Sequence, residues 1–208
     1  MKKQRLVYGV GLNDVPMSAG RAKGNRFKHD PIYARWSDML MRCYSPRYQA
    51  KYPTYAGCTV VEEWKSFSGF KSWMVTQRWE GMHLDKDFLV PGNRIYGPDT
   101  CAFIPQWLNL FYGANHATRG EWPIGVAWVN CKCDRKFAAS LNIDGHRVTL
   151  GRFHTPEEAN QAYREAKHRE LLKRIEKYKA CDSPDPRVLN ALNNRARELL
   201  ANELVGFQ

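Results

Sequence analysis

Three acid–base side chains lie two residues apart near the middle of the chain. His83, Asp85 and Asp87 alternate in the segment HLDKD, and an extended strand would place all three on one side because its side chains repeat every two residues. A pair of carboxylates supplies the hard oxygen ligands that Mg²⁺ prefers, and we expect Mn²⁺ to substitute for it. We therefore predict a metal site at Asp85 and Asp87, with His83 as a candidate base. Salt bridges or turn capping by the two carboxylates are the alternative.

The net charge of the chain favours an anionic partner. Its 208 residues carry 32 Lys and Arg against 21 Asp and Glu, a formal charge of +11, and such a field attracts nucleic acid first and anionic membranes second. No apolar run approaches the roughly 18 residues of a membrane span, and none follows the basic N-terminus as a signal peptide requires. We therefore expect a cytoplasmic protein that binds nucleic acid and no membrane.

The basic residues are concentrated at the N-terminus. Residues 1–30 hold seven Lys and Arg against two Asp, which predicts a basic arm, with a short strand at Leu6–Val10 as an option. Phosphate contact by these cations, which begin with Lys2, Lys3 and Arg5, is one interpretation. A solvated flexible arm is the other.

The six cysteines form no recognisable zinc motif. They lack paired CxxC spacing, and Cys131 with Cys133, which would share one face of a strand, makes an incomplete metal site. In the absence of an export signal, we expect reduced structural cysteines.

The elements that carry these residues change character along the chain. Residues 31–112 contain two helical apolar stripes, predicted to be core rather than a base-stacking platform: Ile32, Trp36, Met39, Leu40 and Cys43, then Trp64, Phe67, Phe70, Trp73 and Met74. From about residue 120, GVAWVN, RKFAASLNI and RVTLGRF predict three strands with turns at Lys132–Asp134 and Asp144–Gly145. Thr155 with Glu158 predicts a capped helix that continues to about Lys179. A last helix at 182–208 carries a Leu stripe suited to packing back or to self-association.

Several motifs of the strand-and-helix segment occur in register. They are GVAW at 125–128, RKFAA at 135–139, LGRF at 150–153 and TPEEA at 155–159. In this order they resemble the Apetala2 (ethylene-response-factor) DNA-binding domain over roughly residues 122–170. The resemblance implies a sheet that enters the major groove, with DNA-binding residues Trp128, Lys132, Arg135, Lys136, Ser140, Asn142, Arg147 and Thr149. A sheet whose polar residues only face solvent is the alternative.

The middle of the chain resembles a second family. LDKDFL at 84–89, GN at 92–93, YGPDTC at 96–101 and Asn109 follow the motif order of degenerate HNH-type proteins of phages and prophages. In that group an Apetala2-type domain often follows the HNH-like one. The resemblance implies a homing or free-standing endonuclease, acting in a bacterial cytoplasm, in which one Mg²⁺ bound by Asp85 stabilises the transition state. Asn93 or Asn109 would orient a turn or bind phosphate.

Two positions depart from the HNH pattern. The base position after Asp85 holds Lys86, a poor base unless strongly desolvated, and the Asn position before Cys101 holds Thr100. We predict an endonuclease that nicks or cleaves double-stranded DNA, with catalytic candidates His83, Asp85, Lys86, Asp87, Asn93, Thr100 and Asn109. The first alternative is a DNA-binding or regulatory protein that keeps the HNH-like fold without activity. The second is an assembly or host-takeover factor that uses the C-terminal Leu stripe.

The predicted fold class is α+β. It comprises a basic arm (1–30), a helical, ββα-type HNH-like domain (31–112), a three-stranded antiparallel sheet packed on a helix (120–180) and a C-terminal helix (182–208). The oligomeric state, monomer or homodimer, is not determined by these patterns.

Overall fold

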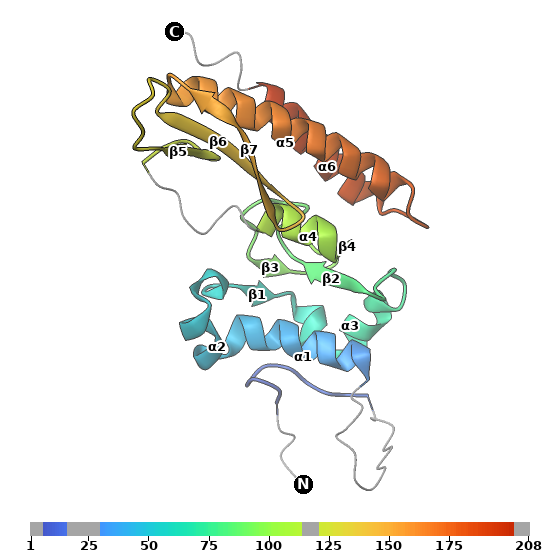
Figure 1. Cartoon of the computed structure of the whole chain (residues 1–208). Coiled ribbons are helices and arrows are strands. Elements are labelled where there is room, and N and C mark those ends of the chain that lie inside the picture. Colours follow the sequence, from blue (N-terminus) through green and yellow to red (C-terminus); the bar gives the residue numbers. More distant parts are fainter. Residues whose placement is uncertain (1–5, 16–29, 114–120, 202–208) are drawn as a thin grey trace, which may run out of the picture. The chain divides into compact units, whose positions relative to one another are not determined.

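The computed structural model describes residues 6–15, 30–113 and 121–201. They belong to two compact units, Met1–Ile104 and Pro105–Gln208, which are described separately. The fold is mixed α+β, as predicted, with six α-helices and a three-stranded antiparallel sheet among the described residues (Figure 1). Lys2, Lys3 and Arg5 of the predicted arm lie outside the described residues. None of the described helices is both long and apolar enough to cross a membrane.

The first unit is built on α1 (Pro31–Tyr44), whose apolar stripe the sequence predicts. Asp30 caps it by accepting a hydrogen bond from the Ile32 amide at 2.9 Å, and Pro31 occupies the first helical position. All five residues of its predicted apolar stripe are buried. The helices and 3₁₀ turns that follow are α2 (Pro46–Lys51), η1 (Pro53–Tyr55), η2 (Glu62–Lys65) and α3 (Phe67–Met74).

Short strands complete this unit. β1 (Thr59–Val60) pairs in parallel with β3 (Ile95–Tyr96), and β2 (Met82–Asp85) pairs with β4 (Ala102–Pro105). The core beneath them is aromatic. Trp36 and Trp64 are fully buried, and the indole of Trp36 donates a hydrogen bond to the Trp64 carbonyl at 2.7 Å. The second aromatic stripe is therefore core, as predicted, and not a surface on which bases stack.

Residues 6–15 of the predicted basic arm are folded against the rest of the first unit. Val7 forms an isolated bridge with Gly11 instead of a strand over Leu6–Val10, and Leu12 bridges to Ser66. A side chain at Gly11 would collide with Leu40, so the backbone passes directly over α1. Only glycine fits where the backbone of residue 11 contacts Leu40. The charge pattern, from which the arm was predicted, carries no information on this contact.

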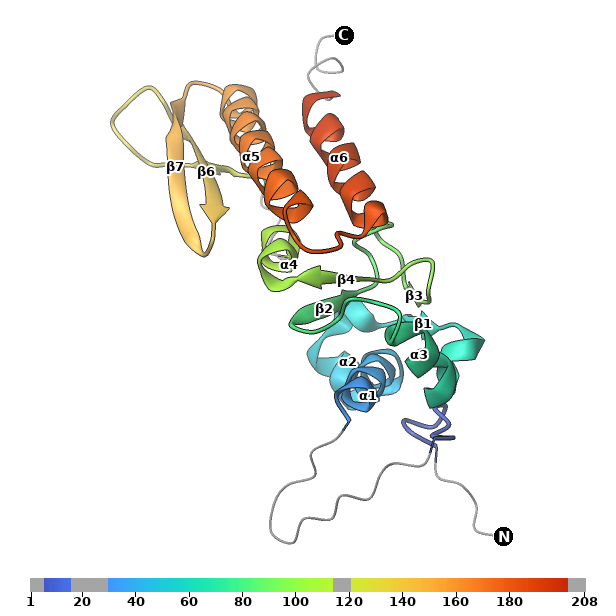
Figure 2. The same ribbon diagram turned by 90° about the vertical axis from the view of Figure 1, so that its right-hand side faces the viewer.

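The second unit has three layers. The antiparallel sheet β5 (Val126–Trp128), β6 (Phe137–Ile143) and β7 (His146–Phe153) packs on α5 (Pro156–Lys179), and α6 (Pro186–Ala201) packs on the other side of α5 (Figures 1 and 2). Asp144 and Gly145 form the predicted hairpin turn, both with positive φ. Thr155 caps α5 as predicted by accepting from the Glu158 amide at 3.2 Å.

The C-terminal helix packs back on the chain. Its buried residues are Val188, Leu192 and Ala196, one per turn along α6, while Leu200 of the predicted Leu stripe is exposed. The α4 helix (Gln106–Gly113), predicted as the end of the HNH-like domain, belongs to this second unit. It is attached to α5 by Lys167, a buried lysine whose ammonium donates to the Phe111 carbonyl at 3.1 Å.

Candidate nucleic-acid interface and carboxylate cluster

One face of the sheet in the second unit is turned away from α5. Along β6, Ala139 and Leu141 are buried, and Leu141 packs with Tyr163 of α5. Because strand side chains alternate, Ser140 and Asn142 point to the opposite side. This side is the outer sheet face.

Cross-strand pairing adds residues of β7 to the outer sheet face. Thr149 pairs with Ser140 and Arg147 pairs with Asn142, and paired residues share a face. The Arg147 Nε donates a hydrogen bond to the Ser140 hydroxyl at 3.0 Å. Four residues predicted as DNA contacts are thus brought together on one surface.

A fifth residue of the outer sheet face was not predicted from the sequence. The register shifts between Ala139 and Ser140, so that Gly151 pairs with Ala139 and Arg152 with Ala138. Without this bulge, simple alternation from Arg147 and Thr149 would place Gly151 on the outer side; the bulge places Arg152 there instead. Gly151, at φ 149°, is the signal that could have revealed it, because a glycine inside a strand pattern often marks a bulge.

The remaining predicted DNA contacts lie beside this face. Lys132, Arg135 and Lys136 are in the loop between β5 and β6, where the Lys136 ammonium donates to the Cys131 carbonyl. Trp128 pairs with Phe137, and Phe137 lies three residues before Ser140, so these two point to opposite faces of the sheet. Trp128 is therefore not on the outer sheet face, although it is 49% exposed.

The same loop corrects the prediction for two cysteines. Cys131 and Cys133 are joined by a disulfide, whereas reduced thiols on one face of a strand were predicted. The reason is that β5 ends at Trp128, and the turn that follows brings the two Cα atoms to 5.3 Å, a separation that a disulfide can bridge.

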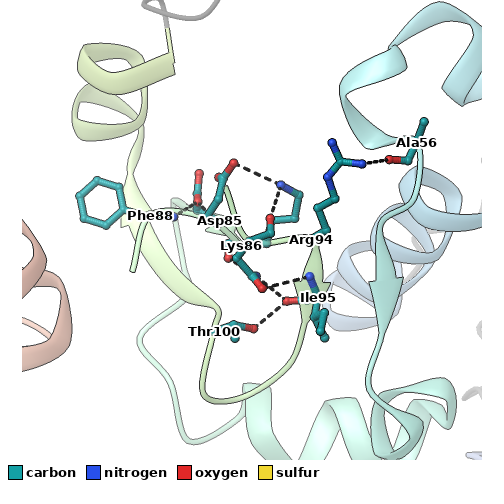
Figure 3. A network of polar contacts seen from close by, with 9 residues as sticks. Ala56, Asp85, Lys86, Phe88, Arg94, Ile95 and Thr100 are labelled. Atoms are coloured by element: carbon teal, nitrogen blue, oxygen red, sulfur yellow. Dashed lines mark hydrogen bonds and ion pairs between the residues drawn. The ribbon is translucent and has the colours of Figure 1, made fainter. Parts of the chain in front are cut away.

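In the first unit, Asp85 ends β2 and caps the turn that follows. Its carboxylate accepts hydrogen bonds from the amides of Asp87 at 2.9 Å and Phe88 at 2.7 Å (Figure 3). The strand therefore stops before Asp87, and the predicted alternation holds for His83 and Asp85 only. Local hydrogen bonding by an Asp side chain is a common way to end a strand.

Lys86 cross-links the loop after β2. Its ammonium donates to the Asp87 carboxylate at 3.2 Å and to the Asn93 carbonyl at 3.0 Å, and only 11% of the side chain is exposed. The amide of Asn93 in turn donates to the carbonyls of Lys86 and Ile95, each at 2.7 Å (Figure 3). The Thr100 hydroxyl donates to the same Ile95 carbonyl at 2.7 Å. The predicted site residues Lys86, Asp87, Asn93 and Thr100 thus satisfy one another and the backbone.

The two acid–base side chains of β2 have shifted pKa values. Burial, together with the neighbouring Asp87 carboxyl, raises the pKa of Asp85 to about 6. Burial lowers the pKa of His83, and the nearby Arg35 and Arg42 cations lower it further. At neutral pH the His83 imidazole is therefore neutral, and Asp85 takes up a proton at a higher pH than an ordinary carboxyl does.

The residues of this loop are a poor fit for a resident divalent ion. No group of three His, Cys, Asp or Glu side chains within 6–15, 30–113 and 121–201 is arranged to hold a metal. One oxygen of Asp85 is engaged by two amides, and one oxygen of Asp87 is paired with the Lys86 ammonium, which would repel a cation. Asn109 lies half-buried on α4, in the other unit.

Comparison with families, curated proteins and solved structures finds no match for this chain.

Proposed function

We propose that this protein binds double-stranded DNA through the outer sheet face. The observation that carries the proposal is the gathering of Ser140, Asn142, Arg147, Thr149 and Arg152 on one side of strands that contain no Asp or Glu. A twisted two- or three-stranded ribbon has the width to enter the major groove.

The chemistry of this face suits direct readout of bases. Arg147 and Arg152 can each donate two hydrogen bonds to guanine, and Asn142 can pair in the same manner with adenine. The cationic loop residues Lys132 and Arg135 at the edge of the sheet would contact phosphates, which position the protein without selecting a sequence.

The first unit has a structural role in this proposal. Lys86 occupies the position where the HNH pattern has its base, and it is committed to Asp87 and Asn93. We therefore favour a DNA-binding protein in which the HNH-like unit does not hydrolyse DNA. Hydrolysis stays the second candidate, because the raised pKa of Asp85 beside His83 is typical of groups that transfer protons.

Selection of bound sequences from a random duplex library, followed by affinity measurement, tests DNA reading. Arg147→Ala and Arg152→Ala are each expected to weaken specific binding by about 1–3 kcal/mol and to relax the selected sequence at one position. Arg197→Ala, an exposed arginine of α6, is the matched control and should leave both unchanged. Equal affinity of all three variants and the parent for every duplex would refute the role of the face.

Incubation of supercoiled plasmid with Mg²⁺, Mn²⁺ or EDTA separates the two candidates. Binding without strand breaks in either metal agrees with the proposal. Metal-dependent nicking that is lost in Asp85→Asn would instead establish the nuclease, since Asn keeps the turn-capping oxygen but cannot exchange a proton.

A further inference from the structure

The first unit carries a second aromatic group at the border of its core. Tyr48 of α2, Tyr52 between α2 and η1, and Tyr55 of η1 form a contiguous cluster, here the tyrosine platform. The ring centroids of Tyr48 and Tyr52 are 4.7 Å apart, and those of Tyr48 and Tyr55 are 5.7 Å apart. Core aromatics such as Trp36 are fully buried, whereas these three rings are half-buried or exposed, and Tyr52 is 40% exposed. Tyr55 packs against the core with one part of its side chain, whereas Tyr48 and Tyr52 do not belong to the core cluster.

Cations surround the tyrosine platform. The Lys51 ammonium lies 5.3 Å from the Tyr52 ring centroid, and the Arg42 guanidinium lies 5.7 Å from that of Tyr55. Arg47, one helical turn before Lys51 on α2, is exposed. The segment from Met39 to Val61 contains no Asp or Glu, so the local field is positive and is not neutralised from within the segment.

Two side chains that bind backbone carbonyls hold the segment of the tyrosine platform in place. The Gln49 amide donates to the carbonyls of Cys43 at 2.6 Å and Arg42 at 3.2 Å, which ties α2 to the end of α1. Arg94 donates to the Ala56 carbonyl at 3.0 Å and thereby attaches the segment after η1 to the strand β3 side of the unit (Figure 3). A surface that is already ordered loses little conformational entropy when a ligand binds.

We propose that the tyrosine platform binds a single-stranded segment of nucleic acid. Partly exposed aromatic side chains with cations beside them match an unpaired strand, since each base offers a flat face for stacking and each phosphate a negative charge. In a duplex the faces of the bases are covered by their neighbours, so stacking on Tyr52 requires unpaired bases. An acidic protein would meet the same charge but would leave the ring faces without matched partners.

This inference deepens the proposed function, because it rests on nucleic acid being the ligand but uses a different surface and a different form of that ligand. Arg94, whose guanidinium binds the carbonyl of the residue after Tyr55, directly follows Asn93, whose carbonyl accepts from Lys86. A strand held on the tyrosine platform would therefore run near the loop that carries Lys86. The outer sheet face would read the duplex, and the tyrosine platform would hold a strand that has locally opened.

The test compares single-stranded and duplex oligonucleotides on the full chain. Fluorescence anisotropy is measured with a labelled oligothymidine of about 12 nucleotides, within the usual site size of such surfaces, and with a duplex of equal length. Tyr52→Ala should weaken single-strand binding roughly 5- to 150-fold, the range for loss of one stacked base. Tyr52→Phe keeps the ring and should stay within about twofold of the parent. Tyr8→Ala, a tyrosine outside the platform that is equally exposed at 41%, is the matched control.

Duplex binding distinguishes the two proposals. Tyr52→Ala should leave duplex affinity unchanged, whereas Arg147→Ala should weaken duplex binding and leave single-strand binding unchanged. If the parent binds the single strand but no duplex, the role of the sheet fails and that of the tyrosine platform stands. Absence of single-strand binding, or equal binding by Tyr52→Ala with a native melting profile, overturns the inference.

Discussion

Lys86 lies at a position where the sequence suggests a catalytic residue, but its contacts are structural. Its ammonium is buried between the Asp87 carboxylate and the Asn93 carbonyl, and its own carbonyl accepts from the Asn93 amide. The Lys86 side chain is 11% exposed and that of Asp87 49%, so water can replace the ammonium at Asp87 but less readily at the half-buried Asn93 carbonyl.

Replacement of Lys86 should therefore be costly to folding. We expect Lys86→Met to lower the free energy of unfolding by about 1–3 kcal/mol, since it leaves Asp87 and the Asn93 carbonyl without their donor. Urea denaturation measures the change. Lys65→Met, which removes an exposed ion pair with Glu62, is the matched control and should be nearly neutral. Equal stability of both variants would show that the Lys86 contacts are dispensable.

Asp85 should give the protein a pH dependence of a definite sign. Its pKa in the folded chain is raised to about 6, above the value of about 3.9 in an unfolded chain. Between these values the folded state binds more protons than the unfolded state, so the contribution of Asp85 to stability falls as pH rises through this window. Asp85→Asn, which keeps the oxygen that caps Asp87 and Phe88, should lose this slope and gain about 1–2 kcal/mol over the parent at neutral pH. The measurement is the free energy of unfolding of parent and variant at both ends of this pH window. The same pH dependence in the variant as in the parent would contradict the assignment to Asp85.

At the scale of the element, local patterns determine what the sequence can reveal. The start of α5 follows from the Thr155 cap, and the hairpin turn from Asp144 and Gly145, because each of these signals acts within a few residues. The end of β2 was misjudged because the Asp85 side chain captures backbone amides, which a two-residue period cannot express. The division at Ile104 likewise depends on long-range packing.

The bulge in β7 is a further feature of this kind, and it admits a direct test. Gly151 has φ 149°, a conformation that L side chains rarely adopt, and a Cβ there would lie 3.3 Å from the Phe153 ring. We expect Gly151→Ala to cost about 1–3 kcal/mol of stability and to weaken duplex binding, since Arg152 depends on the bulge for its side of the sheet. The control Gly145→Asn places a residue that tolerates positive φ where nothing lies within 4 Å, and should change neither quantity. An unperturbed Gly151→Ala protein would mean that the strand adopts the regular register without loss.

For the molecule as a whole, cysteine accessibility reports on how the chain is assembled. Cys43, Cys58 and Cys101 are buried, and burial raises the pKa of each thiol, to about 12 for Cys43 and Cys101. Because the thiolate is the reactive form, we expect these three to resist alkylation in the native state at neutral pH. Cys181, which is only half-buried, should react. Mass spectrometry after native alkylation, with and without urea, measures this. Rapid labelling of the three buried thiols in the native protein would contradict the packing of the first unit.

The net charge of +11 makes binding to any nucleic acid dependent on salt at the level of the whole molecule. Each phosphate neutralised releases counterions, so the logarithm of affinity should fall with the logarithm of salt at roughly 0.9 per contact on duplex DNA. Lys132, exposed in the loop beside the outer sheet face, should contribute one such contact. Lys132→Gln is then expected to reduce the slope by about one and to weaken binding equally for all sequences, whereas Lys65→Gln should leave the slope unchanged. Anisotropy titrations over a range of salt concentrations provide the measurement. A slope near zero in the parent would mean that the protein makes no phosphate contacts. An unchanged slope in Lys132→Gln would mean that Lys132 does not contact a phosphate.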